Sequence, residues 1–292
     1  MNHKAGFVNI IGNPNVGKST MMNALVGENL SIITSKAQTT RHRILGIVNN
    51  ENYQIVFSDL PGILKPHYKL QEKMLHFIEV AIQDADVFLY MVEAGETKVD
   101  EEIAQKIIQS KKPVVVLINK IDLSTQEEIM VQIQHWSEIF SGSQVIPISA
   151  LNNFNIEKVK DVILDMLPEN PPYFPKDELT DKHMRFFVAE IIREKILLNF
   201  KQEVPYSVEV VVDQYKEEEN LTRIFAYIYV ARESQKMIIL GKQGRAIKKL
   251  GTDARLDIEK FIDQKVFLEL TVKVLKDWRD NDKQLKRLGY EN

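Results

Sequence analysis

The sequence of 292 residues contains no cysteine, which excludes a disulfide framework, a thiol nucleophile and a zinc site built from thiolates. It has no apolar run near the roughly 20 residues of a membrane-spanning helix, and no apolar stretch of signal-peptide length at its start. Neither sign of charge dominates, because 38 basic residues nearly balance 41 acidic ones. Hydrophobic residues make up 44% of the chain, which excludes intrinsic disorder. We therefore expect a soluble, cytoplasmic, globular protein.

The length predicts two domains of about 100–200 residues each, and the sequence pattern changes near residue 170. Before that point apolar, strand-like runs alternate with amphipathic, helix-like stretches, an order typical of a doubly wound α/β domain with a parallel sheet. The expected strands are 7–12, 43–48, 54–59, 86–92, 113–119 and 144–149. The expected helices are 18–27, 69–84, 100–110, 125–139 and 154–167.

Four prolines between residues 168 and 175 end this pattern, because proline continues neither a helix nor a central strand. The chain beyond reads as α-β-β-α-α-β, a small α+β domain. Its expected elements are a helix at 182–199, strands at 206–213 and 221–231, helices at 234–240 and 244–262, and a strand at 265–274. We place the first domain at 1–170, a linker at 171–180 and the second domain at 181–292.

The segment from Gly12 to Ser19 fits the phosphate-binding pattern G-x-x-x-x-G-K-[ST], and it follows a strand and opens a helix. In such a loop the backbone N–H groups surround phosphates, Lys18 adds positive charge and the Ser19 hydroxyl is a ligand for Mg²⁺. We expect the whole loop to bind a nucleotide: Gly12, Asn13, Pro14, Asn15, Val16, Gly17, Lys18, Ser19 and Thr20. The first domain is then a P-loop nucleotide-binding domain.

A D-x-x-G sequence starts at Asp59, at the carboxyl end of an apolar strand. It describes an ordinary turn when it stands alone, but after a P-loop it predicts a carboxylate for Mg²⁺ and a Gly62 N–H for the γ-phosphate. The loop continues through Leu60, Pro61 and Ile63, which we also place at the nucleotide. Thr40, in a polar segment before the second strand, is the expected second hydroxyl ligand of Mg²⁺, with a surface loop as the alternative.

The sequence Asn119-Lys120-Ile121-Asp122 follows the most apolar strand and indicates which base is bound. The Asp122 carboxylate can accept both N–H donors of guanine, whereas adenine offers no such pair of donors. Asn119 and Lys120 would support the base and brace the P-loop. The segment of Ser149, Ala150 and Leu151 would offer a backbone N–H to the guanine O6. These motifs predict GTP and GDP as ligands and a GTPase as the activity.

The residue after D-x-x-G is Ile63, where many GTPases place a glutamine that orients the attacking water. We therefore expect slow hydrolysis that depends on Mg²⁺, Lys18, Thr40 and Gly62. Asn15 is a candidate ligand for K⁺, which would supply a second positive charge at the phosphates. A turn-stabilising role for Asn15 explains the residue equally well.

In the second domain a G-x-x-G sequence, Gly241 to Gly244, lies between two short amphipathic helices. An ordinary helix–helix turn is the alternative, but this loop clamps single-stranded RNA in KH domains. Six basic residues and only one acidic residue lie in 236–255, a charge pattern that favours a polyanion. We expect RNA to contact Ile239, Gly241, Lys242, Gln243, Gly244, Arg245, Lys248 and Lys249. The spacing of Phe225, Tyr227 and Tyr229 predicts that their rings lie in the core.

The sequence resembles the bacterial Era-type GTPases over nearly its whole length. The resemblance rests on GNPNVGKST at 12–20, KAQTTRHRILGI at 36–47, DLPGI at 59–63, NKID at 119–122 and ISAL at 148–151. In the second domain it rests on the type II KH segments 238–261 and 265–279. Two departures are small: Asn13 replaces a usual arginine, and Leu60 replaces a usual threonine.

The resemblance implies a factor in the assembly of the small (30S) ribosomal subunit, whose KH domain binds the 3′ end of 16S ribosomal RNA. It also implies potassium-stimulated hydrolysis, and cytoplasmic residence with some peripheral attachment to the inner membrane. We expect the protein to be a monomer. The alternative is a nucleotide-regulated, membrane-associated cell-cycle scaffold for which RNA binding is incidental.

Overall fold

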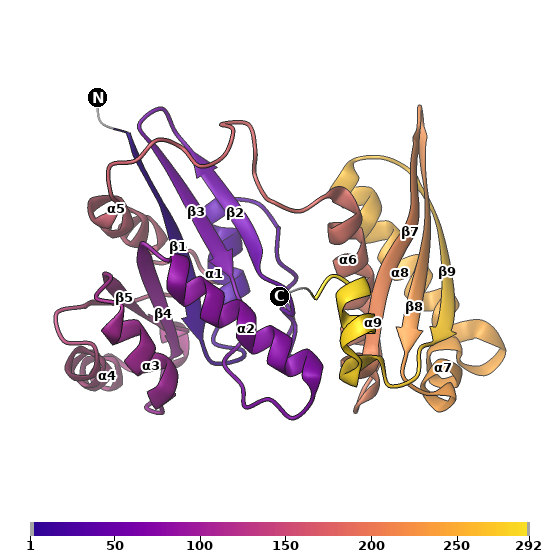
Figure 1. Ribbon diagram of the computed structural model, residues 1–292, viewed down its shortest axis with the longest axis horizontal. Helices are drawn as coiled ribbons and strands as arrows, with labels where there is room; N and C mark the ends of the chain where they lie inside the picture. Colours follow the sequence, from indigo (N-terminus) through magenta and orange to yellow (C-terminus); the bar gives the residue numbers. More distant parts are fainter. Residues whose placement is uncertain (1–2, 291–292) are drawn as a thin grey trace. The chain divides into compact units, whose positions relative to one another are not determined.

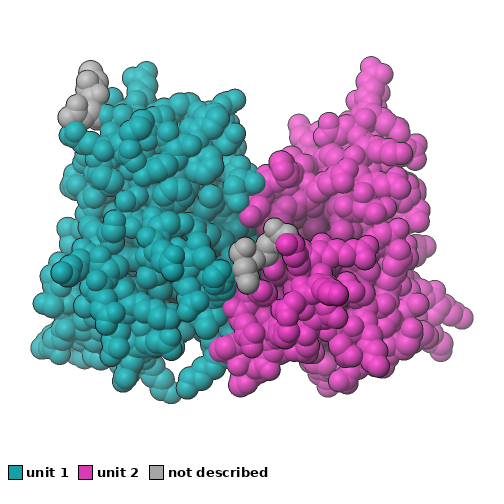
Figure 2. All heavy atoms as spheres, viewed as in Figure 1, with its two compact units in different colours: residues 1–65, 74–181 teal, residues 66–73, 182–292 magenta. Residues whose placement is uncertain are grey.

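A computed structural model describes residues 3–290 (Figure 1). The chain forms two compact units, one built from residues up to 65 together with 74–181, the other from 66–73 together with the chain from 182 onward (Figure 2). The domain boundaries expected from the sequence remain a prediction, and the two units are described separately below. Within the described residues no helix is both long and apolar enough to span a bilayer.

The first unit is built on a six-stranded sheet with the strand order β2-β3-β1-β4-β5-β6. Its strands are β1 (Lys4–Gly12), β2 (Ile44–Asn49), β3 (Tyr53–Asp59), β4 (Val87–Glu93), β5 (Val114–Asn119) and β6 (Gln144–Pro147). Parallel pairing joins β3, β1, β4, β5 and β6, so the carboxyl ends of these strands meet at one edge of the sheet. Strand β2 pairs antiparallel with β3, a departure from the parallel sheet that the sequence pattern predicts.

Helices cover both faces of this sheet, as the doubly wound prediction requires. The helices are α1 (Lys18–Val26), α2 (Lys69–Asp84), α3 (Glu101–Gln109), α4 (Gln126–Ile139) and α5 (Ile156–Met166). Ile78 of α2, Ile107 of α3 and Trp136 of α4 share one buried cluster against the sheet, and α1 and α5 pack together (Figure 1). Strands buried on both faces are apolar throughout, which explains why the sequence pattern located them.

The second unit has a three-stranded sheet with the order β7-β8-β9. Strand β7 (Val208–Glu218) pairs antiparallel with β8 (Leu221–Val230), and β8 pairs parallel with β9 (Val266–Val274). Helices α6 (Met184–Asn199), α7 (Glu233–Leu240) and α8 (Arg245–Ile262) complete the expected α-β-β-α-α-β order. Their apolar residues pack with alternate residues of each strand, so the core lies on one face of the sheet.

The aromatic residues of β8 lie on the opposite face, which corrects the prediction that they belong to the core. Along this strand Ile224, Ala226 and Ile228 are buried in the core cluster, while Phe225, Tyr227 and Tyr229 alternate with them and are half-buried. Spacing by two residues is shared by both faces of a strand, so periodicity alone could not distinguish a core aromatic from an outward one.

The C-terminal segment contains two elements that the sequence pattern did not predict, a single 3₁₀ turn at Trp278–Asp280 and the short helix α9 (Asp282–Arg287). Trp278 is fully buried and donates its indole N–H to the Ser207 carbonyl at 3.1 Å. The Tyr290 hydroxyl donates to Glu209 at 2.8 Å. These bonds fasten the segment to the start of β7.

Residues 66–73 belong to the second unit although the rest of α2 belongs to the first. The Arg279 guanidinium lies 4.7 Å from the centre of the Tyr68 ring, and Lys69 forms an ion pair with Asp282. The segment follows the D-x-x-G loop after three residues, so it continues directly from the expected γ-phosphate contact.

Candidate functional site

The P-loop connects β1 to α1, and glycine is required where it bends. A Cβ at Gly12 would lie 2.1 Å from the Met91 carbonyl oxygen, a distance that no side chain tolerates. Gly17 caps α1 with a φ of 101° and Asn15 has a φ of 66°, both in the left-handed region. The loop therefore wraps tightly and directs the N-terminus of α1 toward the space above it, an arrangement suited to phosphate.

Lys18 is folded over this loop and is almost completely buried. Its Nζ donates to the carbonyls of Gly12 at 3.0 Å and Asn13 at 2.8 Å. Burial lowers the pKa of Lys18 to about 8, against the opposing attraction of Asp59 and Glu96. A phosphate at the loop would add negative charge beside the ammonium group and favour its charged form.

Three oxygen-bearing side chains from three segments converge beside the P-loop. The Ser19 hydroxyl donates to Asp59 Oδ2 at 2.7 Å, and the Thr40 hydroxyl donates to the same oxygen at 3.1 Å. The two hydroxyl oxygens are 3.0 Å apart. Thr39, the neighbour of Thr40, instead bonds to Thr34 and to the Lys36 carbonyl, so it is Thr40 that joins this oxygen cluster.

The oxygen cluster fits a magnesium ion. Asp59 is fully buried, and among the described residues its second oxygen, Oδ1, has no hydrogen-bond partner. Burial raises the pKa of Asp59, and the hydrogen bond from Ser19 opposes this effect. A buried carboxylate with an unsatisfied oxygen is costly unless a cation neutralises it. Two hydroxyls and one carboxylate are oxygen ligands of the kind that Mg²⁺ takes, together with water and phosphate.

The loop from Asp59 to Ile63 is docked on the P-loop. A Cβ at Gly62 would lie 2.8 Å from Pro14, so only glycine allows this approach. The Ile63 N–H donates to the Gly12 carbonyl at 3.2 Å. The side chains of Leu60 and Ile63 are buried in the apolar cluster under the sheet edge, and Leu60 also contributes to the lining of the nucleotide cleft.

The motifs expected at the base meet at the ends of β5 and β6. Asn119 is buried, donates to the Val16 carbonyl at 2.8 Å and accepts from the Ala150 N–H at 2.9 Å. Asp122 accepts from the Ser149 hydroxyl at 2.6 Å. Asn119 thus ties the P-loop to the 149–151 segment. The contact of a backbone N–H of residues 149–151 with the base remains a prediction.

Two glutamates, Glu93 at the end of β4 and Glu96 in the connection to α3, contact the same region, and sequence reasoning missed both. Glu96 accepts a hydrogen bond from the Asn13 side chain, and Glu93 forms an ion pair of 2.7 Å with Lys120. No motif marks either glutamate. The sequence indicates them only by their position at and just after the carboxyl end of β4, which pairs with β1.

A cleft of about 350 Å³ lies at the P-loop. It is lined by the P-loop, by residues 32–36 and 38–40, and by Leu60, Gly62 and Lys120. A cleft of this size lies within the range of roughly 300–1,000 Å³ that is usual for sites of small organic ligands. The nucleotide contacts expected from the sequence remain predictions, and the structure brings their residues to one edge of the sheet.

The G-x-x-G loop of the second unit connects α7 to α8. Gly241 and Gly244 have φ values of 70° and 72°, and a Cβ at Gly241 would lie 2.6 Å from the Ala246 side chain. Lys242, Gln243 and Arg245 are exposed. The loop thus presents backbone N–H groups and cations at the N-terminus of an 18-residue helix, where negative charge is stabilised.

The flanking residues differ in their accessibility. Lys248 and Lys249 are exposed on α8, and Lys249 is held by Asn199 at 2.7 Å and by Asp253 at 2.5 Å. Ile239 is fully buried in the core of the unit, so its side chain is not available to RNA, which corrects the prediction of a contact there. Its neighbour Ile238 is 49% exposed, because the turn of α7 directs only one of the two outward.

Comparison with known proteins decides the family. A family model described as 50S ribosome-binding GTPase matches residues 7–120, and one described as KH domain matches residues 203–279. The chain is 44% identical to the GTPase Era of Ruminiclostridium cellulolyticum over 100% of its own length and 99% of that protein. It is 46% identical to the GTPase Era of Syntrophus aciditrophicus, over 98% and 95% of the two chains. The chain belongs to the Era family of GTPases.

The fold agrees with solved members of the Era family. A single-residue variant of Aquifex aeolicus Era bound to GDP·AlF₄⁻ matches with a TM-score of 0.94 at 39% identity, over 99% of this chain and 100% of that one. Era in complex with MgGDPNP and nucleotides 1506–1542 of 16S ribosomal RNA matches equally well, at 40% identity over the same shares. The expected architecture, a P-loop GTPase domain followed by a KH domain, is confirmed, and the chain is a GTP-hydrolysing enzyme.

The lowered pKa of Lys18 predicts that nucleotide affinity falls in alkaline solution. In the nucleotide-free protein the Lys18 side chain loses its charge as the pH of the solution rises above about 8. Bound phosphates favour the charged form, so above that pH nucleotide binding takes up a proton. We expect the Kd for GDP to rise by up to about tenfold per pH unit above this value. Fluorescent GDP titrations between about pH 7 and about pH 9 measure it.

Lys18→Arg is the control for this prediction, because its guanidinium stays charged throughout this range. Whatever its absolute affinity, this variant should lack the added slope, and any titration of the nucleotide itself is common to both proteins. Equal slopes for the two proteins would contradict the assignment.

Asp122→Asn is predicted to change the base preference. The amide cannot accept from both guanine donors, but it can donate to the oxygen that xanthine carries in place of the 2-amino group. We expect GTP affinity to fall roughly 10- to 100-fold, the loss typical of a charged hydrogen bond, and xanthosine triphosphate to bind better than GTP. Competition titrations of both nucleotides measure it, with Asp161→Asn on α5 as the control. An unchanged preference would remove Asp122 from the base site.

Proposed function

We propose that this chain is a GTP-driven switch that binds the 3′ end of 16S ribosomal RNA and acts in assembly of the small ribosomal subunit. The observation that carries the proposal is the exposed basic G-x-x-G loop at the N-terminus of α8, in the same chain as a P-loop site. The relative solved with nucleotides 1506–1542 of that RNA supports this choice of strand. A role on the ribosome implies residence in the cytoplasm.

The nucleotide is held by charge and by backbone donors. The P-loop N–H groups, the N-terminus of α1 and Lys18 receive the β- and γ-phosphates, while Asp122 selects guanine. Ser19, Thr40 and Asp59 are the side chains that would hold Mg²⁺, which when bound neutralises charge that develops on the phosphates. The relative solved with MgGDPNP supports this assignment. The Gly62 N–H is the donor that we expect to meet the γ-phosphate.

We expect slow hydrolysis in this site because the glutamine with which many GTPases orient the attacking water is absent from the position after D-x-x-G. Ile63 occupies the position after D-x-x-G, and its side chain is buried in the core. Catalysis therefore depends on stabilising charge at the phosphates. Asn15, exposed beside the cleft, is the residue we propose as a ligand for K⁺, which would add a positive charge where other GTPases use an arginine.

The switch consists of two loops that share one ligand. When the γ-phosphate is lost, the loops that contain Thr40 and Gly62 would lose the contacts that order them, as in other GTPases. The loop that contains Gly62 leads into residues 66–73, which belong to the second unit, and the proposed linker 171–180 also joins the two domains. We propose that these two connections transmit the nucleotide state to the RNA site, and that RNA binding in turn favours the GTP state.

Charge reversal in the glycine loop tests the RNA assignment. We expect the double variant Lys242→Glu with Arg245→Glu to bind an RNA from the 3′ end of 16S ribosomal RNA at least about tenfold more weakly. The slope of log Kd against log salt should fall by roughly 0.7 for each phosphate that the variant no longer neutralises. Fluorescence anisotropy at two salt concentrations measures both quantities.

The matched control reverses two other exposed lysines of the same unit, Lys260→Glu with Lys265→Glu. Lys260 is 15 residues beyond Arg245 on α8, a distance of roughly 20 Å along the helix. Net charge changes equally in both variants. Equal losses of affinity in the two variants would mean that RNA binds to any basic part of the surface. The scaffold alternative would then be favoured over the ribosomal role.

A further inference from the structure

A second hollow lies in the second unit, on the face of the sheet opposite α6, α7 and α8. It has a volume of about 190 Å³ and lies between the sheet and α9. Sites that enclose a whole drug-sized ligand measure roughly 300–1,000 Å³, so this hollow is sized for part of a larger ligand. The side chains that give it its chemistry are Tyr227, Tyr229, Lys273, Gln284, Arg287 and Asp213.

Two tyrosine rings form its floor. The ring centres of Tyr227 and Tyr229 are 6.0 Å apart and tilted by 52°, so the rings do not stack face to face on each other. Both rings are half-buried rather than enclosed, because their strand directs them away from the core. Exposed aromatic faces on a sheet are the platforms on which proteins stack unpaired bases.

Cations accompany these rings. Lys273 Nζ lies 3.3 Å from the centre of the Tyr227 ring, a cation–π contact that holds the ammonium group over the sheet. Arg287 enters the hollow from α9, and Gln284 adds an amide from the same helix. Asp213 is the one acidic residue in the lining. The combination of ring surface with two cations and an amide complements a base and its adjoining phosphate.

The hollow lies at the end of the sheet nearest to the glycine loop. Strands β8 and β9 are parallel, with Val230 opposite Val274, so Tyr229 and Lys273 lie at the same end of the sheet. Helix α7, which leads into the loop, begins at Glu233, four residues after Tyr229. A single-stranded RNA longer than the four nucleotides that such a loop clamps must continue past one end of this domain.

We propose that this hollow is a second RNA contact, in which one base stacks on the Tyr229 ring and its phosphate meets Lys273 and Arg287. The inference rests on the proposed RNA binding and extends it to the face of the sheet opposite α6, α7 and α8. It names single-stranded RNA outside the four clamped nucleotides as the ligand.

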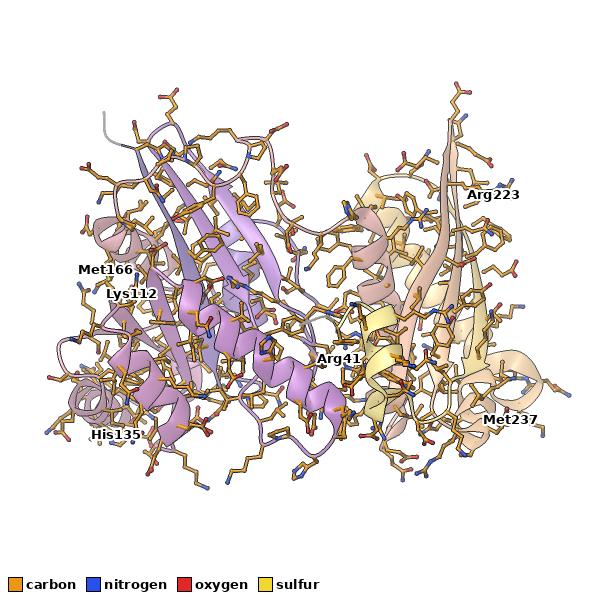
Figure 3. The ribbon with its side chains drawn as sticks, in the orientation of Figure 1. Arg41, Lys112, His135, Met166, Arg223 and Met237 are labelled. Atoms are coloured by element: carbon orange, nitrogen blue, oxygen red, sulfur yellow. The ribbon has the colours of Figure 1, made fainter. Side chains whose placement is uncertain are left out.

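The test compares a four-nucleotide RNA with a twelve-nucleotide RNA, both from the 3′ end of 16S ribosomal RNA. Tyr229→Leu should raise the Kd of the longer RNA by roughly 5- to 100-fold, the range for loss of one base stack, and leave the shorter RNA unchanged. Lys273→Gln should also weaken only the longer RNA, and it should lower the slope of log Kd against log salt by roughly 0.7 for the one phosphate that is no longer neutralised. Arg223→Gln is the control. It removes a cation from the same face, at the end of β8 away from α7 (Figure 3).

A measurement on the unaltered chain protects the test against variants that fold poorly. RNA of the longer kind with 4-thiouridine at single positions should crosslink, at one position outside the clamped four, to the peptide that contains Tyr227 and Tyr229. Crosslinks confined to residues 236–255, or variants without effect on the longer RNA, would overturn the inference and leave the proposed function standing. If neither RNA binds the unaltered chain, the proposed function itself is wrong.

Discussion

The nucleotide site depends on one buried carboxylate. Asp59 lies at the end of β3 without exposed surface, and Ser19 and Thr40 both donate to one of its oxygens. Its other oxygen has no partner among the described residues, so the oxygen cluster around it fits a cation. Because the three side chains come from three segments, whatever binds there controls the order of all three. The P-loop itself needs no such ligand, since Asn119 and the glycines already fix its backbone.

Both candidate sites have the same arrangement, one that favours negatively charged ligands. Each is a glycine-containing loop with positive φ values that ends at the N-terminus of a helix, α1 in one unit and α8 in the other. Backbone N–H groups at the helix N-terminus and the helix dipole favour phosphate at both places. They differ in what surrounds the loop. The first lies in a cleft near the motif that is expected to select a base, and the second is open and basic, which suits an RNA strand rather than a mononucleotide.

The sequence predicts most of what backbone geometry and motif order determine. Strands buried on both faces are apolar runs, and the P-loop requires glycine, so both can be read directly. Three kinds of feature cannot be read from the sequence. The alternation along β8 does not say which face is covered, so periodicity places Tyr227 and Tyr229 wrongly in the core. Ile239 lies next to the exposed Ile238, and only the rotation of α7 separates them. Glu96 and α9 are positioned by tertiary contacts that no local pattern records.

The central claim is that nucleotide state and RNA affinity are coupled. A ligand shifts such an equilibrium only through different affinities for the two states, and the coupling must then be the same in both directions. The direct measurement is the Kd of the 16S 3′-end RNA with GDP and with a non-hydrolysable GTP analogue, at fixed Mg²⁺ and salt. The account predicts tighter binding with the analogue, by roughly 5- to 150-fold for a coupling of usual size, and no such difference in Thr40→Val. Identical dissociation constants in the two nucleotide states of the unaltered chain would contradict it.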